Sequence, residues 1–302
     1  MDLPLTDLYF DFYDVITRLR CHSADTTEAL FYFGGQRVEP AAPERTEVVV
    51  TLSCPEWPER GFFTSLLRKD GLTKRIEVDR RTEDGWHREV DHTFTDWSEV
   101  PSPLPPFRYS RLWERLAVGP GTCLELADGT GVLLTGDNYI GKTSAALVLC
   151  SRGARLVSDS LAVLDVDSGS FLRHDSPLGF RRGGRRHHLA RILDGEHRET
   201  VSPDTGLVLL ARSERFLGRP NLDQTNVRHL VRLVPSEQAS TGPADRRTDP
   251  AVWFSGASRH RISEQLPERT LVVGIPDGAG PEQVADLIEA RLAATEALDP
   301  AC

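Results

Sequence analysis

Apolar and polar positions alternate in short runs over the first hundred residues, a pattern typical of half-buried β-strands. The strand-like runs are 47–52, 62–67, 75–78 and 86–94. Asp70-Gly71 and Asp84-Gly85 lie between consecutive runs, and Asp-Gly at such a place supplies the positive φ of a tight hairpin turn. The pattern therefore predicts a β-rich, mostly antiparallel N-terminal domain over 1–100, with a role in selecting substrate.

Four prolines among the six residues 101–106 predict a stiff linker, because proline fits neither a helix interior nor a central strand. Beyond it, 107–302 alternates between strand-like and helix-like patterns. The predicted strands are 123–126, 132–135, 155–158, 161–166, 207–211, 230–234 and 271–275. Helices are expected at 142–152, ended by Gly153, and at 281–298, with Pro281 in the first turn. This alternation predicts an α/β fold, which becomes α+β overall when the N-terminal part is counted.

Composition excludes several classes of protein. The net charge of −9 argues against binding to the negatively charged backbone of nucleic acid. The sequence contains no run of eighteen apolar residues, which is the length that a membrane-spanning helix needs. The N-terminus lacks the basic and apolar regions of a secretory signal. Five widely spaced cysteines without a CxxC pair favour a reducing, cytoplasmic location with neither a disulfide framework nor a zinc site.

The strongest motif is Gly136-Asp137-Asn138-Tyr139-Ile140-Gly141-Lys142-Thr143, which matches GxxxxGK[ST] and is followed by Ser144 at the start of the predicted helix. Glycines let the backbone curl so that its amides point at phosphate oxygens, and the helix aims its positive N-terminus at the same place. In such a loop Lys142 reaches the outer phosphates and the Thr143 hydroxyl binds Mg²⁺. A plain glycine turn with a surface lysine is the alternative. Lysine is rare in this chain: Lys69, Lys74 and Lys142 are the only lysines among 36 basic residues.

The lengths of the next helix and strand indicate that Asp159 is a second residue of this site. A helix of about ten residues from Thr143 runs roughly 15 Å away from the phosphates, and the strand 155–159 returns by about 16 Å. Asp159 is therefore expected beside the loop, where a carboxylate could hold Mg²⁺ or accept a proton from a hydroxyl nucleophile. The alternative is a turn residue at the end of a strand.

These residues resemble a known family. The segment 119–166, with its phosphate loop, the helix stop Arg152-Gly153 and the RLVSD strand at 155–159, is similar to the catalytic domain of HPr kinase/phosphorylase and its kinase-only relatives. The resemblance implies a mixed sheet around the nucleotide, as in phosphoenolpyruvate carboxykinase, and ATP-dependent phosphorylation of a serine on a protein or peptide. It also implies Asp159 as base, metal ligand or both, and leaves a homo-oligomer open because the family often forms symmetric assemblies.

Three departures from the family pattern favour a kinase-only relative of the type found in peptide natural-product pathways. Ser160 replaces the second of the family's paired aspartates, and no histidine occurs near Gly121-Thr122. Asn138-Tyr139 replaces the usual Ser-Gly inside the loop and brings a bulky ring near the nucleotide. The missing histidine argues against the reverse, phosphorylase reaction.

Weaker signals follow the Asp159 strand. The run 181–188 (RRGGRRHH) reads as a glycine-hinged mobile loop, in which Arg181 and Arg182 neutralise phosphoryl charge or hold an acidic peptide; the alternative is a solvated surface loop. His187-His188 is weak as a metal site because no third ligand stands at a suitable spacing. Carboxylates that could complete a second Mg²⁺ site are Asp175, Glu196 and Glu199, and the sequence does not choose among them.

The sequence thus predicts a P-loop serine kinase that uses ATP and Mg²⁺, with a protein or ribosomal precursor peptide as acceptor. Two alternatives remain: a nucleotide-binding regulatory or scaffold protein without phosphotransfer, and a kinase of free serine or another small metabolite.

Overall fold

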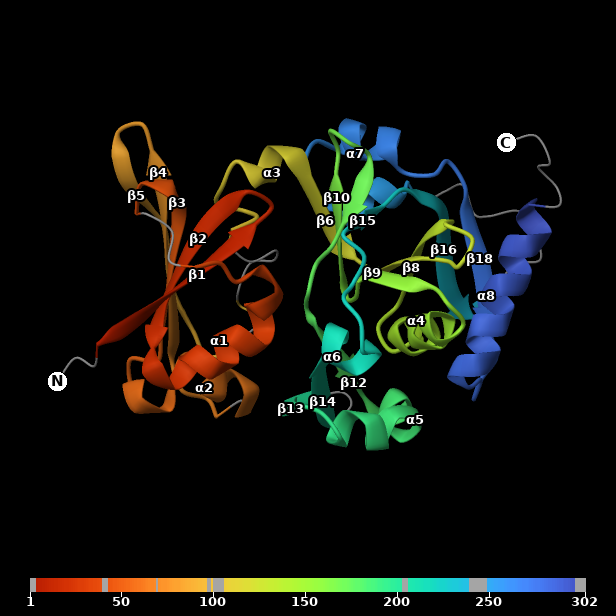
Figure 1. Cartoon of the computed structure of the whole chain (residues 1–302), viewed down its shortest axis with the longest axis horizontal. Coiled ribbons are helices and arrows are strands. Elements are labelled where there is room, and N and C mark those ends of the chain that lie inside the picture. The colour runs from red at the N-terminus through yellow and green to blue at the C-terminus, as the bar shows by residue number, and fades with distance from the viewer. Residues whose placement is uncertain are drawn as a thin grey trace. The chain divides into compact units, whose positions relative to one another are not determined.

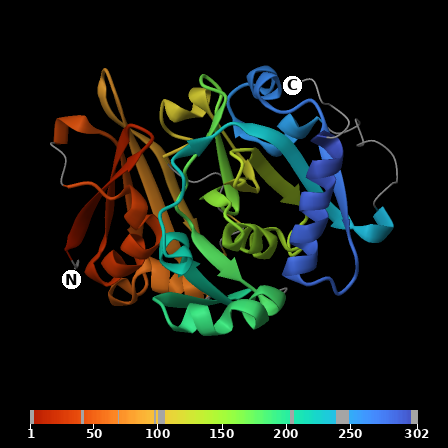
Figure 2. The same ribbon diagram turned by 45° about the vertical axis from the view of Figure 1, so that its right-hand side comes forward.

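The computed structural model, drawn in Figures 1 and 2, describes residues 4–39, 43–68, 70–96, 99, 106–202, 206–238 and 249–296. Within these ranges only the backbone is described for Pro43, Arg60, Arg182, Gly183, Ser202, Gln238 and Glu296. The predicted linker 101–106 lies outside the described residues except for Pro106. Contacts between Cα atoms divide the chain into two compact units: unit 1 is Met1–Arg115 with Arg198–Val208, and unit 2 is Leu116–His197 with Leu209–Cys302.

Unit 1 is built on a five-stranded sheet. Its strands are β1 (Leu5–Phe12), β2 (Val15–His22), β3 (Thr46–Ser53), β4 (Lys74–Thr82) and β5 (Gly85–Phe94), paired in that order. The predicted strands 47–52, 75–78 and 86–94 are present as β3, β4 and β5. The sheet is antiparallel except for β2 and β3, which pair in parallel. A helix, α1 (Thr26–Phe33), connects those two strands, as a parallel pair requires.

One predicted element of unit 1 is wrong. The run 62–67 does not form a strand but the helix α2 (Phe62–Arg68). A short apolar run cannot by itself separate a strand from a buried helix segment. The helix is favoured by a partner remote in the sequence: the Asp25 carboxylate accepts hydrogen bonds at 2.8 Å from the first two backbone amides, those of Phe62 and Phe63.

Unit 2 is centred on a second five-stranded sheet. In spatial order its strands are β18 (Thr270–Ile275), β16 (Val227–Pro235), β8 (Gly131–Gly136), β7 (Thr122–Glu125) and β9 (Arg155–Ser158). The first three run parallel, whereas β7 is antiparallel to both of its neighbours. The β7–β8 hairpin was predicted from Asp128-Gly129. Alternate residues of β8 point into different cores, since Val132 and Leu134 join one apolar cluster and Leu133 joins another.

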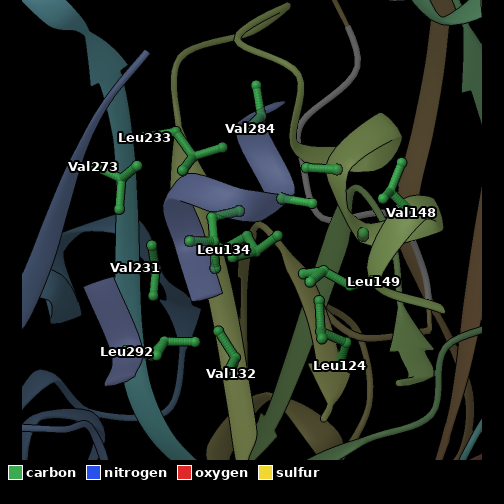
Figure 3. Close-up of a cluster of buried hydrophobic side chains, with 14 of the residues drawn as sticks. Leu124, Val132, Leu134, Val148, Leu149, Val231, Leu233, Val273, Val284 and Leu292 are labelled. Carbon is green, nitrogen blue, oxygen red and sulfur yellow. The ribbon is translucent and has the colours of Figure 1, made fainter. Parts of the chain in front are cut away.

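Helices α4 (Lys142–Ser151) and α8 (Pro281–Glu296) cover one face of this sheet. Figure 3 shows their side chains gathered with those of the strands in one cluster around Leu134. Both helices were predicted from the sequence. In α8 the buried face carries Val284, Ile288 and Leu292, whose spacing of four residues repeats about once per helical turn.

The opposite face of the central sheet packs on another five-stranded sheet. Its strands are β15 (Gln224–Thr225), β11 (Ser170–Leu172), β10 (Leu161–Asp165), β6 (Leu116–Pro120) and β17 (Ser255–Gly256). A small third sheet has the order β12 (Pro177–Phe180), β14 (Gly206–Arg212) and β13 (His197–Ser202), of which β13 falls in unit 1 apart from His197. The remaining helices are α3 (Leu112–Arg115), α5 (Arg182–Leu193), α6 (Ser213–Leu217) and α7 (Arg259–Gln265). The architecture is therefore mixed α/β, as predicted, and none of the described helices has the length and apolar character needed to cross a bilayer.

Candidate active site

The predicted phosphate loop connects the end of β8 to the start of α4. Its two glycines have left-handed backbones, with φ of 129° at Gly136 and 102° at Gly141, and Tyr139 joins them at 72°. Gly136 is also required by space, because a Cβ at this position would lie 2.4 Å from the carbonyl oxygen of Leu233 on β16. The loop is thus a tight turn that begins against the backbone of the parallel neighbour β16 and feeds directly into the N-terminus of α4.

Lys142 is the first residue of α4 and reaches back across the loop. Its ammonium donates to the carbonyl oxygens of Gly136 and Asp137, each at 2.8 Å. Burial lowers the pKa of the Lys142 ammonium, although the charges of Asp159 and Asp137 partly oppose that shift. The ammonium is held by neutral carbonyls, which a more strongly charged acceptor such as a phosphate oxygen can replace.

Asp159 follows directly after β9 and lies beside the loop. The Thr143 hydroxyl, one residue after Lys142, donates to both carboxylate oxygens of Asp159, at 2.9 and 3.0 Å. The aspartate is 2% exposed. The structure therefore brings together the two groups that the sequence singled out, a hydroxyl on the loop helix and a carboxylate at the end of the next strand.

Two further hydroxyls, which the sequence motifs did not indicate, donate hydrogen bonds to the same carboxylate. Thr122, which is 1% exposed, donates to Asp159 at 2.6 Å, and Ser160 donates at 3.0 Å. Hairpin register could have found Thr122: it pairs with Leu134, two residues before Gly136. The related enzymes carry a histidine near Gly121-Thr122; in this chain the Thr122 hydroxyl lies there and contacts Asp159.

A polar network supports the Asp159 backbone. The Ser176 hydroxyl donates to the Asp159 carbonyl oxygen at 2.9 Å. The neighbouring carboxylate, Asp175, accepts from Arg173 Nε at 2.9 and 2.8 Å and from Asn221 Nδ2 at 2.8 Å. The Asp175 carboxylate is thus held by Arg173 and Asn221.

The other two carboxylates considered for a second metal position are exposed. They are Glu196 and Glu199, and Glu199 falls in unit 1. Among the residues that the structure describes, no three His, Cys, Asp or Glu side chains lie close enough together to hold a metal ion. His187 and His188 are therefore not part of such a group.

The arginine-rich run is not the loop that the sequence predicted. Residues Arg182–Leu193 form the helix α5, because Ile192 is buried in an apolar cluster and the His188 ring packs 5.6 Å from the rings of Phe180 and Phe216. Phe180, Phe216 and most of the apolar cluster around Ile192 lie outside the run 181–188, so its pattern of glycine and charge does not show these contacts.

The start of α5 lies against α4, the helix that follows the phosphate loop. A Cβ at Gly184 would lie 2.9 Å from the Ser144 hydroxyl, so glycine permits this close approach. The exposed Arg181 guanidinium lies over the Tyr139 ring, 4.9 Å from its centroid. The Arg182 side chain lies outside the described residues. Arg181 is therefore the arginine of this run that the structure places at the loop.

Comparison with known proteins gives little beyond this geometry. No family model matches the chain, and no curated protein matches it. Among solved structures it is similar to the Hpr(Ser) kinase/phosphatase from Coxiella burnetii, with 18% identity and a TM-score of 0.35 over 61% of this chain and 94% of that chain.

Proposed function

We propose that the protein is an ATP-dependent kinase that transfers the γ-phosphoryl group to a serine hydroxyl of a protein or ribosomal precursor peptide. The observation that carries the proposal is the contact between Thr143 and Asp159, at 2.9 and 3.0 Å, at the N-terminus of the loop helix. In this proposal unit 2 has an HPr-kinase-like catalytic fold and unit 1 helps to select the substrate.

The loop supplies the binding site for the triphosphate. Backbone amides from Gly136 to Ser144 and the positive end of α4 attract phosphate oxygens. Lys142 exchanges its two carbonyl acceptors for the outer phosphates, and Arg181 adds positive charge from the start of α5. Charge that develops on the transferring group is thereby stabilised by groups already in place before the reaction.

The same donor set fits Mg²⁺. This ion prefers oxygen ligands and is commonly held by one or two carboxylates together with substrate phosphates. The Thr143 hydroxyl and the Asp159 carboxylate are such oxygens and already meet at one point. When bound there, Mg²⁺ neutralises phosphate charge.

Asp159 also orients the acceptor. In the transfer, the serine oxygen forms a bond to the γ-phosphorus, the bond from that phosphorus to the β,γ-bridging oxygen breaks, and the serine proton passes to the Asp159 carboxylate. Nucleoside diphosphate and phosphoserine are the products. Hydroxyl donors from Thr122, Thr143 and Ser160 fix the position of the carboxylate.

To test the proposal, the whole 302-residue chain is incubated with Mg²⁺, ATP and candidate acceptors. Mass spectrometry then follows the gain of about 80 Da that one phosphoryl group adds to an acceptor. Lys142→Ala should abolish transfer. Asp159→Asn should lower turnover by about 10³-fold while changing nucleotide affinity much less. The matched control is Asp286→Asn: Asp286 pairs with Arg152 at the other end of α4, and its side chain is 64% exposed.

Each alternative gives a different result. A folded, fully active Lys142→Ala variant would exclude this mechanism. Nucleotide binding without transfer to any acceptor would indicate a regulatory or scaffold protein, and phosphorylation of free serine rather than peptides would indicate a metabolite kinase.

A further inference from the structure

The middle of the phosphate loop carries a bulky residue in a strained backbone. Tyr139 has a φ of 72°, and residues other than glycine seldom adopt this left-handed conformation. The residue is 51% exposed, so its ring is not held by burial in an apolar core. Strain of this kind persists where other contacts of the residue offset it.

The Tyr139 ring contacts an arginine that comes from another element. The Arg181 guanidinium lies over the ring, 4.9 Å from its centroid, within the range of about 6 Å over which a ring face attracts a cation. The backbone of Arg181 is fixed separately, because this residue begins α5 and its carbonyl oxygen accepts from the Arg185 amide at 2.7 Å. The helix thus sets where the arginine starts, and the ring sets where its charge lies.

The charge of Arg181 is available to a ligand at the loop. No carboxylate among the described residues forms an ion pair with its guanidinium. Burial is the main cause of the lowered pKa of the Lys142 ammonium, and the positive charge of Arg181 adds to that shift. Two cations from different elements therefore act on one another at the loop, and an anion beside them would relieve this repulsion.

The direction from which Arg181 approaches indicates which phosphate it meets. In the proposed function the amides of 136–144 and the N-terminus of α4 surround the inner phosphates. Arg181 reaches the loop from α5, outside that ring of amides, so the terminal phosphate is the one within its reach. A ring face, unlike a carboxylate, leaves the positive charge of a guanidinium unneutralised, and a guanidinium pairs well with phosphate oxygens.

We propose that Tyr139 is a positioning residue that holds Arg181 at the γ-phosphate and thereby makes the site prefer a nucleoside triphosphate to a diphosphate. This role rests on the proposed function, since it requires a nucleotide on the loop. Without the ring, the long arginine side chain would have to be ordered when the nucleotide binds, at a cost in conformational entropy. The same preference favours release of the diphosphate product, because transfer removes the phosphate that Arg181 holds.

The test measures nucleotide affinity and needs no acceptor. Titration calorimetry on the whole 302-residue chain with Mg²⁺ compares ADP with the β,γ-imido analogue of ATP. Arg181→Met should weaken binding of the analogue about tenfold and leave ADP binding nearly unchanged. Tyr139→Leu removes the ring face and should weaken binding of the analogue about threefold, again with little effect on ADP. Tyr139→Phe keeps the ring face and should bind both nucleotides as the wild type does.

Two further variants separate positioning from a merely structural role. Tyr139→Gly removes the backbone strain together with the ring, so a purely structural role predicts binding at least as tight as in the wild type, whereas positioning predicts the loss seen with leucine. In the Arg181→Met background, Tyr139→Leu should have no further effect, because the ring acts through the guanidinium. The matched control is Arg186→Met, at an exposed arginine of α5, which should leave both affinities unchanged.

Equal ratios of analogue to ADP affinity in the wild type and Tyr139→Leu would overturn the proposal; circular dichroism checks that the variant is folded. Phosphoryl transfer by a leucine variant with an unchanged ratio would reject the role of Tyr139 and keep the kinase. A ratio that depends on Tyr139 and Arg181, without transfer to any acceptor, would support the role of Tyr139 and reject the kinase. Absence of nucleotide binding to the wild type would overturn both.

Discussion

The Asp159 carboxylate accepts hydrogen bonds from hydroxyls that come from three parts of the chain. Thr122 stands at the start of β7, Thr143 in the first turn of α4, and Ser160 directly after Asp159 itself. These donors are neutral and small. They fix the position of the carboxylate without the strong charge pairing that an arginine would impose.

Thr122 is expected to act as a positioning residue. Thr122→Val removes a 2.6 Å hydrogen bond while keeping the shape of the side chain, so kcat should fall about tenfold with little change in KM for ATP. Thr122→Ser should restore most of the rate because it restores the hydroxyl. Steady-state kinetics of the two variants provide the measurement. Equal kcat values for the valine variant and the wild type would show that the bond has no catalytic consequence.

His174 is a buried titratable residue near the site. Burial lowers the pKa of its imidazole to about 4, and the charge of Asp175 opposes the shift. The folded protein therefore holds this histidine neutral at pH values where the unfolded chain, with an ordinary histidine pKa near 6.5, binds a proton.

This difference makes stability depend on pH. Between about 6.5 and 4 the unfolded state binds more protons, so the free energy of unfolding falls as the pH is lowered. From pH 6.5 to 5 the loss attributable to His174 should be about 1.5 kcal/mol. Urea unfolding at both pH values should show this loss, and His174→Gln should lack it. The control is His260→Gln, since the His260 side chain is 81% exposed; an unchanged pH dependence in the His174 variant would contradict the assignment.

At the scale of elements, α4 is held from more than one side. Its residues from Ala145 to Cys150 are all buried. Ala146 and Leu149 pack toward the central sheet and α8, whereas Leu147 and Cys150 pack toward the small sheet and α5. This burial fixes the helix whose N-terminus would hold the phosphates, so the loop has a rigid base.

The helix α2 depends on one remote side chain. Asp25 is fully buried and binds the amides of Phe62 and Phe63, which no residue of the helix could satisfy. Asp25→Ala should therefore lower the free energy of unfolding by about 2 kcal/mol. Asp25→Asn keeps an acceptor oxygen and should cost less. Chemical denaturation measures both, and an alanine variant as stable as the wild type would show that this cap is dispensable.

At the scale of the whole molecule, unit 1 is discontinuous in sequence. The segment Arg198–Val208 belongs to it although the residues on either side belong to unit 2. Within unit 1, Arg198 Nε donates to both carboxylate oxygens of Glu28 at 2.8 Å, and the guanidinium lies 4.6 Å from the Phe31 ring centroid. Both charged side chains are less than one-fifth exposed, at 19% and 16%.

This pair should contribute measurably to stability. A double-mutant cycle with Arg198→Met and Glu28→Gln should give a coupling free energy of about 1 kcal/mol in urea unfolding. The methionine keeps the apolar stem and removes the charge. The exposed pair Arg259 and Asp249, whose side chains are 64% and 36% exposed, should give a smaller value. Equal coupling in the two pairs would mean that burial adds nothing to the Arg198 pair.

The features that could be predicted correctly from the sequence depend on neighbouring residues. Asp128-Gly129 specified the β7–β8 hairpin, Gly136 and Gly141 specified a left-handed loop, and the lengths of α4 and β9 brought Asp159 back beside Thr143. Turn chemistry, helix rise and strand rise act within a few residues, so each can be read from a short stretch of sequence.

Other features depend on contacts that form only when the chain folds. Phe62–Arg68 became a helix because Asp25 caps it, α5 became a helix because Phe180 and Phe216 receive His188, and Thr122 joined Asp159 through strand pairing. Asp25 and Phe62, like His188 and Phe216, are far apart in the chain, and their proximity follows from the packing of the whole unit.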